Sequence, residues 1–156
     1  MSQKSILFVC LGNICRSPMA ETIFNHILDK NNMSNNFEVD SAGLLDYHEG
    51  DKADHRMRSH AEKRGYEIKH RSRPVVQKDF EKFDYIIGMD EQNVRQLNRL
   101  AKTPEQQSKI HKMTDFCKKT EADSIPDPYY GGDKGFEHVI DLLEDACDGL
   151  YVNLTK

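Results

Sequence analysis

The sequence has little of what marks a membrane, secreted or nucleic-acid-binding protein. The apolar run from Ile6 to Leu11 stops at Gly12, far short of the roughly 20 residues of a spanning helix, and it lacks the layout of a cleaved secretory signal. Only four cysteines occur, irregularly spaced and without a C-x-x-C pair, which argues against a disulfide framework. The net charge is −4 without a tail of like charges, which argues against nucleic acid as the main partner. We therefore expect a cytoplasmic protein with free thiols that binds neither membranes nor nucleic acid.

The chain also lacks internal repeats and low-complexity linkers. Its 156 residues, 37% hydrophobic and 31% charged, are typical of one soluble domain of ordinary size with a real core. We therefore expect a single domain over residues 1–156.

Strand and helix patterns alternate along the chain. Continuous apolar or alternating runs predict strands near residues 6–9, 37–43, 83–89 and 109–113. Helical patterns follow at about 17–30, 51–64, 91–100 and 136–150. Ser17 is expected to cap the first helix with Pro18 at its first position, and Asp90 is expected to cap the third. This alternation is typical of an α/β domain with a parallel sheet.

The stretch "VCLGNICRSPMAE" joins the first strand to the first helix. Ligands of open parallel sheets bind where the strands end, and Cys10 stands at that point. Five residues separate Cys10 from Arg16, so the loop can curl around one tetrahedral anion, with backbone N–H groups and the helix N-terminus facing it. The same field favours a nucleophilic thiolate at Cys10, and Arg16 offers a planar fork that matches two phosphoryl oxygens. Ser17 is placed to donate a hydrogen bond to the sulfur.

Other chemistries fit this loop poorly. The Walker pattern needs a second glycine and a lysine, and the dinucleotide fingerprint needs three glycines. Cys10 and Cys15 lack zinc-finger spacing, and no histidine pair follows at a suitable distance. The remaining alternative is that Cys10 is only a small buried residue that ends a strand.

The segment C-L-G-N-I-C-R-S-P, from Cys10 to Pro18, resembles the signature of the low-molecular-weight protein tyrosine phosphatases. The resemblance extends over essentially the whole chain and includes D-P-Y-Y, from Asp127 to Tyr130. It implies an open four-stranded parallel sheet with helices on both faces, a flavodoxin-like α/β fold. It also implies an acid-phosphatase-type phosphomonoesterase that hydrolyses phosphotyrosine in proteins or peptides, and small aryl phosphates, releasing inorganic phosphate.

In the resembling family the aspartate of D-P-Y-Y is the general acid, a role that we carry to Asp127. Flanking prolines restrict the backbone around it, and such an acid typically contributes 10²–10⁴-fold to the rate. The alternative is a rigid turn with solvated carboxylates. The implied mechanism has Cys10 as nucleophile and Arg16 as charge stabiliser, passes through a phosphocysteine, and requires no metal or cofactor.

The resemblance also implies a set of binding and supporting residues. Phosphate contacts are expected from the loop, at Leu11, Gly12, Asn13, Ile14, Cys15 and Ser17. A supporting hydrogen-bond network is expected at Ser41 and His70, although His70 alone would be taken as a surface histidine. Aromatic walls for a phenyl ring are expected from Tyr47, Tyr129 and Tyr130. Many family members have tryptophan where Tyr47 falls, which leaves the peptide preference open.

Cys15 has two interpretations. It is either a small loop residue or a resolving thiol that traps oxidised Cys10 as a reversible disulfide and blocks over-oxidation. The sequence does not decide between them.

Two further activities are known on the same scaffold. Arsenate reductases relay electrons through additional cysteines in the middle of the chain, whereas none occurs here between Cys15 and Cys117. Phosphoarginine phosphatases tend to carry threonine at the position of Ile14, and the apolar Ile14 favours an aryl substrate. A non-catalytic phosphate-binding module would be expected to lose Cys10 or Asp127, and both are present.

Charge is distributed unevenly along the chain. Residues 55–73 carry seven Lys/Arg against two Glu, and residues 121–148 carry nine carboxylates against one lysine. Such segments are usually solvated helix faces. If the basic segment borders the active site, it is expected to steer dianionic substrates.

Overall fold

The computed structural model describes residues 3–128 and 132–156. Its centre is a four-stranded sheet of order β2-β1-β3-β4, in which every neighbouring pair is parallel. The strands are β1 (Lys4–Cys10), β2 (Phe37–Gly43), β3 (Tyr85–Gly88) and β4 (Ile110–Lys112). The open parallel α/β fold and its four strands are therefore confirmed.

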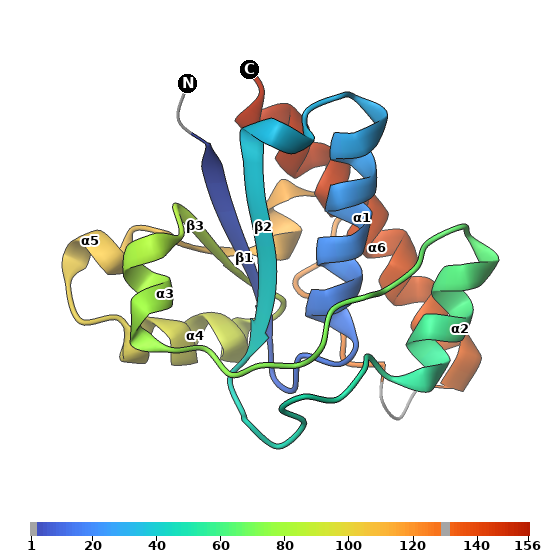
Figure 1. Ribbon diagram of the computed structural model, residues 1–156, viewed down its shortest axis with the longest axis horizontal. Coiled ribbons are helices and arrows are strands. Elements are labelled where there is room, and N and C mark those ends of the chain that lie inside the picture. The colour runs from blue at the N-terminus through green and yellow to red at the C-terminus, as the bar shows by residue number, and fades with distance from the viewer. Residues whose placement is uncertain (1–2, 129–131) are drawn as a thin grey trace.

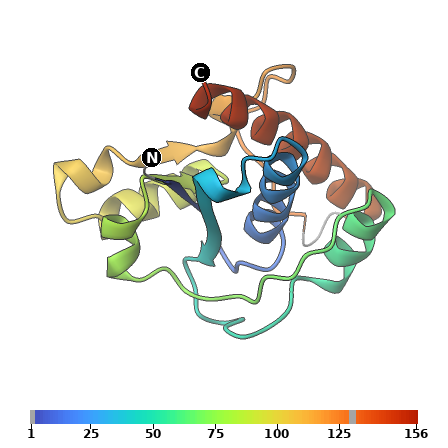
Figure 2. The same cartoon turned by 45° about the horizontal axis from the view of Figure 1, so that its top comes forward.

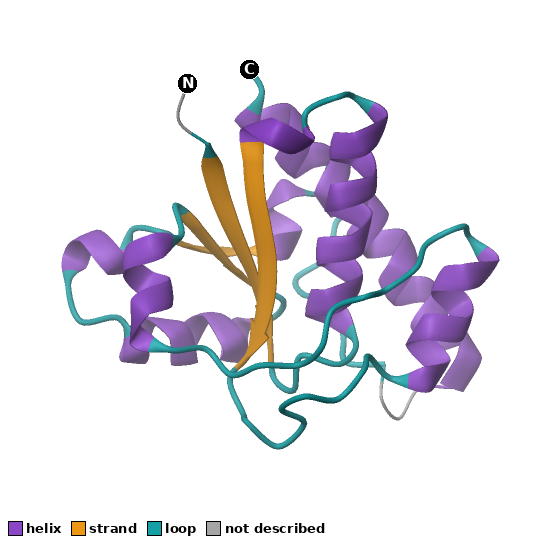
Figure 3. Ribbon diagram, viewed as in Figure 1, coloured by secondary structure: helices purple, strands orange, loops and turns teal. Residues whose placement is uncertain are grey.

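Helices cover both faces of the sheet (Figures 1 and 3). They are α1 (Arg16–Lys30), α2 (His55–Lys63), α3 (Gln77–Lys82), α4 (Glu91–Leu100), α5 (Pro104–Gln107) and α6 (Gly132–Leu154), with 3₁₀ turns η1 (Ser34–Asn36) and η2 (Met113–Phe116). Helices α1 and α6 lie on one face, and α2 packs beside α6. Helices α3, α4 and α5 lie on the opposite side, as the turned view also shows (Figure 2).

Strand β1 is buried on both faces, as its apolar sequence predicts. Successive side chains of a strand point to opposite faces. Ile6 and Phe8 accordingly join the core beneath α1 and α6, whereas Leu7 and Val9 join a second core beneath α3 and α4. All four are fully buried. The end of β1 is therefore held rigidly from both sides.

The C-terminal helix approaches its neighbour closely at one glycine. A Cβ placed on Gly149 would lie 1.7 Å from the carbonyl oxygen of Phe116 in η2. Only a residue without a side chain fits there. Among the described residues, no helix is both long enough and apolar enough to span a membrane.

Three details of the predicted elements are wrong. Ser17 does not cap α1: the helix begins two residues earlier, at Arg16, with Cys15 as N-cap and no side-chain cap, and the Ser17 hydroxyl lies against the Cys10 sulfur instead. The second helix begins at His55 instead of residue 51, because Asp54 caps it by accepting from the N–H groups of Arg56 and Met57. The short helices α3 and α5 were not predicted. Asp90 does cap α4, accepting from the N–H of Asn93.

The order of the strands determines where a ligand binds. Strand β1 lies between β2 and β3, so the chain leaves β1 toward one face and β3 toward the other. Such a topological switch point opens a crevice at the carboxyl ends of the strands. Cys10, the last residue of β1, stands at this crevice.

Candidate active site

The loop from Cys10 to Arg16, here called the phosphate loop, turns its carbonyl groups outward. The carbonyl oxygens of Cys10 and Leu11 accept from the N–H groups of Leu44 and Leu45 at 3.0 and 2.9 Å. Further along the loop, Gly12 O accepts from the Ser72 hydroxyl at 3.0 Å, and Ile14 O accepts from the N–H of Asp54 at 2.7 Å.

The N–H groups of this loop face the other way. Within the described part of the chain, no backbone N–H from Leu11 to Arg16 donates to a protein acceptor. Asn13 adopts a left-handed backbone with φ 58°, which asparagine tolerates and which lets a short loop close on itself. A ring of unused donors at a helix N-terminus forms an anion-binding concavity. The loop is therefore shaped to hold an oxyanion.

The sulfur of Cys10 lies beside this ring, and only 3% of the residue's surface is exposed. Its Sγ is 3.0 Å from Ser17 Oγ. Asn13 Nδ2 donates to the same oxygen at 2.8 Å. Ser17 Oγ accepts from Asn13 and keeps its own proton, so it can donate to the sulfur; a Cys10 thiolate, which has no proton to give, is stabilised by that bond.

The orientation of the Asn13 amide is itself fixed. Its Oδ1 accepts from the backbone N–H of Arg73 at 3.0 Å and lies 2.8 Å from His70 Nε2. Its Nδ2 also donates to Ser41 Oγ at 3.0 Å. The expected supporting residues Ser41 and His70 are thus brought to Asn13. Neither touches Cys10 directly, so they act by orienting the amide that orients Ser17.

A second layer lies behind this network. Ser41 Oγ donates to Glu21 Oε1 at 2.7 Å, and His70 Nδ1 lies 3.2 Å from the same oxygen and 3.4 Å from Asp40 Oδ1. Burial, together with the nearby charge of Asp40, raises the pKa of Glu21 to about 7. Among the described residues, Glu21, Asp40 and His70 form a cluster whose possible ligand atoms all lie within 4.8 Å of one another, close enough to hold a metal ion. Arg73 Nη2, 3.0 Å from Asp40 Oδ2, already supplies positive charge there.

Arg16 is almost fully buried, with 3% of its side chain exposed. Its Nη1 donates to Asp90 Oδ2 at 2.6 Å and to the carbonyl of Ile125 at 3.0 Å. Asp90 follows β3, the strand next to β1, and its second oxygen caps α4. One carboxylate therefore fixes both a helix end and the direction of the guanidinium. Sequence reasoning assigned only the cap. The position of Asp90 directly after a predicted strand of a parallel sheet, where ligand-binding residues gather, was the available signal for more.

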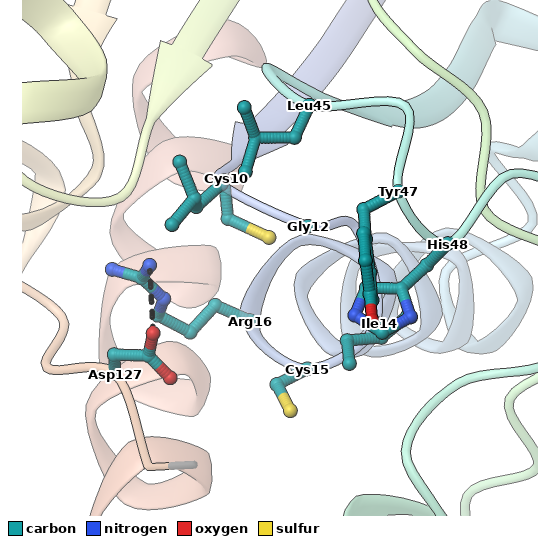
Figure 4. A pocket seen from close by; sticks show the side chains of 10 residues that line it. Cys10, Gly12, Ile14, Cys15, Arg16, Leu45, Tyr47, His48 and Asp127 are labelled. Atoms are coloured by element: carbon teal, nitrogen blue, oxygen red, sulfur yellow. Dashed lines mark ion pairs between the residues drawn. The ribbon is translucent and has the colours of Figure 1, made fainter.

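Asp127 reaches the same crevice from the far end of the chain. Its Oδ2 lies 3.8 Å from Arg16 Nη2, and about half of its side chain is exposed. Figure 4 shows the carboxylate and guanidinium on one side of the pocket, with the Cys10 sulfur between them and the opposite wall. The two separate sequence motifs are thus brought to one place.

The pocket has a volume of about 290 Å³. Its walls are formed by Cys10, Leu11, Gly12, Ile14, Cys15, Arg16, Leu45, Tyr47, His48 and Asp127. Tyr47 and His48 lie across the pocket from Arg16 (Figure 4), and their rings meet edge to face at 4.8 Å. Tyr47 is 83% exposed and therefore forms an open wall. Leu45 and His48 were not predicted, and Tyr129 and Tyr130 lie outside the described residues.

Cys15 lines the same pocket but differs chemically from Cys10. Burial, and then the charge of Asp54, raise the pKa of its thiol well above the ordinary value. At neutral pH Cys15 is therefore a thiol and a poor nucleophile.

The charged segments noted in the sequence meet each other in the fold. Arg64, the C-cap residue of α2, pairs with Glu137, Asp141 and Glu144 of α6 at 2.6–2.8 Å. Part of the basic segment is thus used in helix packing and is not available for substrate steering.

Comparisons with known proteins agree with this geometry. The sequence model of the family described as "Low molecular weight phosphotyrosine protein phosphatase" matches residues 5–156. The rat protein of that name is 41% identical over 94% of this chain and 93% of its own. A crystal structure of a protein tyrosine phosphatase from Entamoeba histolytica covers 97% of both chains, with 47% identity and a TM-score of 0.95. A structure described as a Drosophila arginine phosphatase, DARP, covers 97% of this chain and 98% of its own, with 33% identity and a TM-score of 0.90.

Proposed function

Since the chain belongs to the low molecular weight phosphotyrosine protein phosphatase family, we propose that Cys10, Arg16 and Asp127 perform its chemistry through a phosphocysteine intermediate. The observation that carries this assignment is the phosphate loop: its carbonyls are bonded to partners outside the loop, its N–H groups find no acceptor among the described residues, and the Cys10 sulfur lies 3.0 Å from the Ser17 hydroxyl oxygen. In phosphoryl transfer, electrostatic stabilisation by positioned donors commonly lowers the barrier more than any other single effect.

The first step forms an S–P bond and breaks the P–O bond to the leaving group. Cys10 Sγ attacks phosphorus in line, and the electron pair of the broken bond goes to the phenolic oxygen. Asp127 begins this step in its protonated form and gives its proton to that oxygen. Arg16 and the loop N–H groups hold the three equatorial oxygens, while Asp90 and Ile125 keep the guanidinium in place.

The second step reverses the role of Asp127. Its carboxylate takes a proton from a water molecule whose oxygen attacks phosphorus. The P–S bond breaks, its electron pair returns to Cys10, and inorganic phosphate leaves. The departing thiolate has no proton of its own, so the Ser17 hydroxyl, whose oxygen lies 3.0 Å from the sulfur, donates to it and stabilises it.

We propose a phosphorylated aryl group, with phosphotyrosine as the natural form, as the substrate. Cys10 is nearly buried at the base of the pocket, while Tyr47 and the apolar Leu45 and Ile14 line the walls. A phenyl spacer brings phosphorus to such depth better than the short side chain of phosphoserine. Phosphoarginine is the second candidate, favoured by the likeness to DARP and opposed by the apolar Ile14.

The assay is hydrolysis of aryl phosphates in the presence of a chelator, comparing wild type with Cys10→Ser and Asp127→Ala. We expect no turnover by Cys10→Ser. For Asp127→Ala we expect a loss on the order of 10²–10⁴-fold that shrinks as the leaving phenol becomes more acidic. Full activity in either variant, or a need for added metal, contradicts the mechanism. Phosphotyrosine, phosphoserine and phosphoarginine peptides compared in the same assay decide the substrate class.

We also propose that Cys15 protects Cys10 during oxidation. Both residues line one pocket, and the charge of Cys10 is one of the causes that raise the pKa of the Cys15 thiol. Oxidation of Cys10 to a sulfenic acid removes that charge, after which Cys15 attacks the sulfenic sulfur, releasing water and forming a disulfide. Peroxide-treated protein is expected to yield a peptide cross-linked between these two residues. Sulfonic acid at Cys10 without the cross-link contradicts the proposal.

The four free cysteines support a reducing, cytoplasmic site of action, and the net charge of −4 supports neither nucleic acid nor membranes as partners.

A further inference from the structure

Helix α2 contacts the beginning of α6 through one buried histidine. His60, with 8% of its side chain exposed, makes a short hydrogen bond from Nδ1 to Glu137, and its Nε2 lies 3.2 Å from Asp133 Oδ1. Both ring nitrogens therefore face carboxylates in the first two turns of α6.

The same histidine packs on the residue between these carboxylates. The His60 ring stacks on the fully buried Phe136 ring with an interplanar angle of 4° and a centroid distance of 5.6 Å. The guanidinium of Arg56, one turn earlier in α2, lies 4.9 Å from the centroid of the same ring. Stacking and hydrogen bonding thus fix the first turns of α6 against α2.

The segment that carries Asp127 is held at one end by the sheet and Arg16 and lies at its other end beside these turns of α6. On its N-terminal side, Ile125 is fixed by its N–H, which donates to Met89 O at 2.8 Å, and by its carbonyl, which accepts from Arg16. On its C-terminal side, Pro128 packs on α6: a Cβ placed on Gly135 would lie 3.9 Å from Pro128 Cα. A shift of the first turns of α6 therefore moves Pro128 and the neighbouring carboxyl of Asp127.

Helix α2 is also joined to the phosphate loop. The N–H of Asp54, its N-cap, donates to Ile14 O at 2.7 Å, and the Asp54 carboxylate accepts from the N–H of Arg56 at 2.8 Å. One helix thus contacts both the loop that holds the nucleophile and the helix that lies beside Pro128, the residue after the general acid.

We propose that His60 is a positioning residue for the general acid Asp127, acting through Asp133, Glu137 and Phe136. The inference rests on the proposed function. A general acid must lie within hydrogen-bond reach of the leaving oxygen. A small displacement of the Asp127 carboxyl therefore slows proton transfer to that oxygen, while the binding of phosphate is unchanged. Substituting His60 should therefore resemble a partial loss of the general acid Asp127, and it should differ from a substitution that weakens phosphate binding in the phosphate loop.

The test uses His60→Ala and His60→Gln, with exposed His55→Gln on the same helix as the matched control. For His60→Ala, kcat/KM for phenyl phosphate is expected to fall roughly 5- to 20-fold, a fraction of the full acid contribution. For an ester of a strongly acidic nitrophenol the fall should stay below about 3-fold, because that leaving group needs little protonation. The slope of log kcat/KM against the leaving-phenol pKa becomes steeper, and competitive inhibition by inorganic phosphate stays as in wild type. His60→Gln keeps a donor but loses the stacked ring, so it should fall between Ala and wild type.

A second variant avoids the risk that His60 is needed for folding. Asp133 has a side chain that is 91% exposed, so Asp133→Asn should fold, and Asp148→Asn is its matched control farther along α6. Asp133→Asn is expected to steepen the slope of log kcat/KM against the leaving-phenol pKa, and Asp148→Asn is expected to leave that slope as in wild type.

Slopes equal to wild type in both His60→Ala and Asp133→Asn overturn the inference. A uniform loss on all esters, accompanied only by lower stability, overturns it as well, because that pattern is structural. If wild type does not hydrolyse aryl phosphates at all, the proposed function fails, which is a different and recognisable result.

Discussion

Replacing Ser17 with alanine tests whether its hydroxyl stabilises the thiolate form of the active-site sulfur. In wild type, Asn13 donates to Ser17 Oγ at 2.8 Å, and the same oxygen lies 3.0 Å from Cys10 Sγ, where its hydroxyl can donate to a thiolate. Alanine removes this hydrogen bond while leaving the loop carbonyls bound to their outside partners. The thiolate is then less stable both as the attacking group and as the group that leaves in the second step.

The magnitude follows from the charge on the acceptor. A hydrogen bond to a charged group is worth roughly 1.5–3 kcal/mol. Since about 1.4 kcal/mol corresponds to a tenfold change in rate, both kcat and kcat/KM for an aryl phosphate should fall by roughly 10- to 150-fold. Alkylation of Cys10 by iodoacetate at slightly acidic pH should slow in the same direction.

Ser72→Ala is the matched control. The Ser72 hydroxyl donates to Gly12 O at 3.0 Å, so it supports the same loop without being bonded to the sulfur. Its loss is expected to lower stability by about 1 kcal/mol and activity by only a few-fold. Equal losses of activity and of alkylation rate in the two variants would refute the reasoning, because the effect would then come from the loop as a whole.

Three further predictions concern other parts of the molecule. Gly149→Ala should lower the free energy of unfolding, measured in urea, by about 2 kcal/mol or more, because the added methyl group meets a backbone carbonyl of η2. The control Gly135→Ala should change the free energy of unfolding by less than about 1 kcal/mol. Equal effects of the two substitutions would contradict the close approach at Gly149. The raised pKa of Cys15 keeps its thiolate fraction small at neutral pH, so peptide mapping after alkylation at neutral pH should find the label on Cys10 before Cys15. Label that appears first on Cys15 would contradict this prediction. Asp90→Asn removes the charge opposite a buried guanidinium and should cost about 2 kcal/mol, less than a fully buried pair because Asp90 is a quarter exposed. Bound phosphate, a replacement anion, should restore part of that stability, and an equal loss with and without phosphate would count against this account.

What could be predicted from the sequence was mostly local. The residues from Cys10 to Arg16 are contiguous, so one strand, one loop and one helix N-terminus place them together without knowledge of the rest of the fold. The strands were found because continuous apolar runs are distinctive. Helices α3 and α5, with six and four residues, are too short to show a helical period.

The rest depended on long-range contacts. Asp90 meets Arg16 only because β3 lies next to β1, a neighbourhood that the sequence does not show. Two roles were predicted for the Ser17 hydroxyl, a helix cap and a hydrogen bond to the Cys10 sulfur. The structure shows no cap and places the hydroxyl oxygen 3.0 Å from the sulfur, while its contact with the Asn13 amide was not predicted. His60 carries no motif, and only the packing of α2 on α6 places it between two carboxylates.

The most direct test of the mechanism is to trap the covalent intermediate. Rapid acid quenching of the enzyme during turnover of an aryl phosphate, followed by peptide mass spectrometry, shows which residue carries the phosphoryl group. The account predicts one phosphoryl group on the peptide that contains Cys10, bound to sulfur and absent in Cys10→Ser. A phosphoryl group on any other side chain, or turnover that persists in Cys10→Ser, would contradict it.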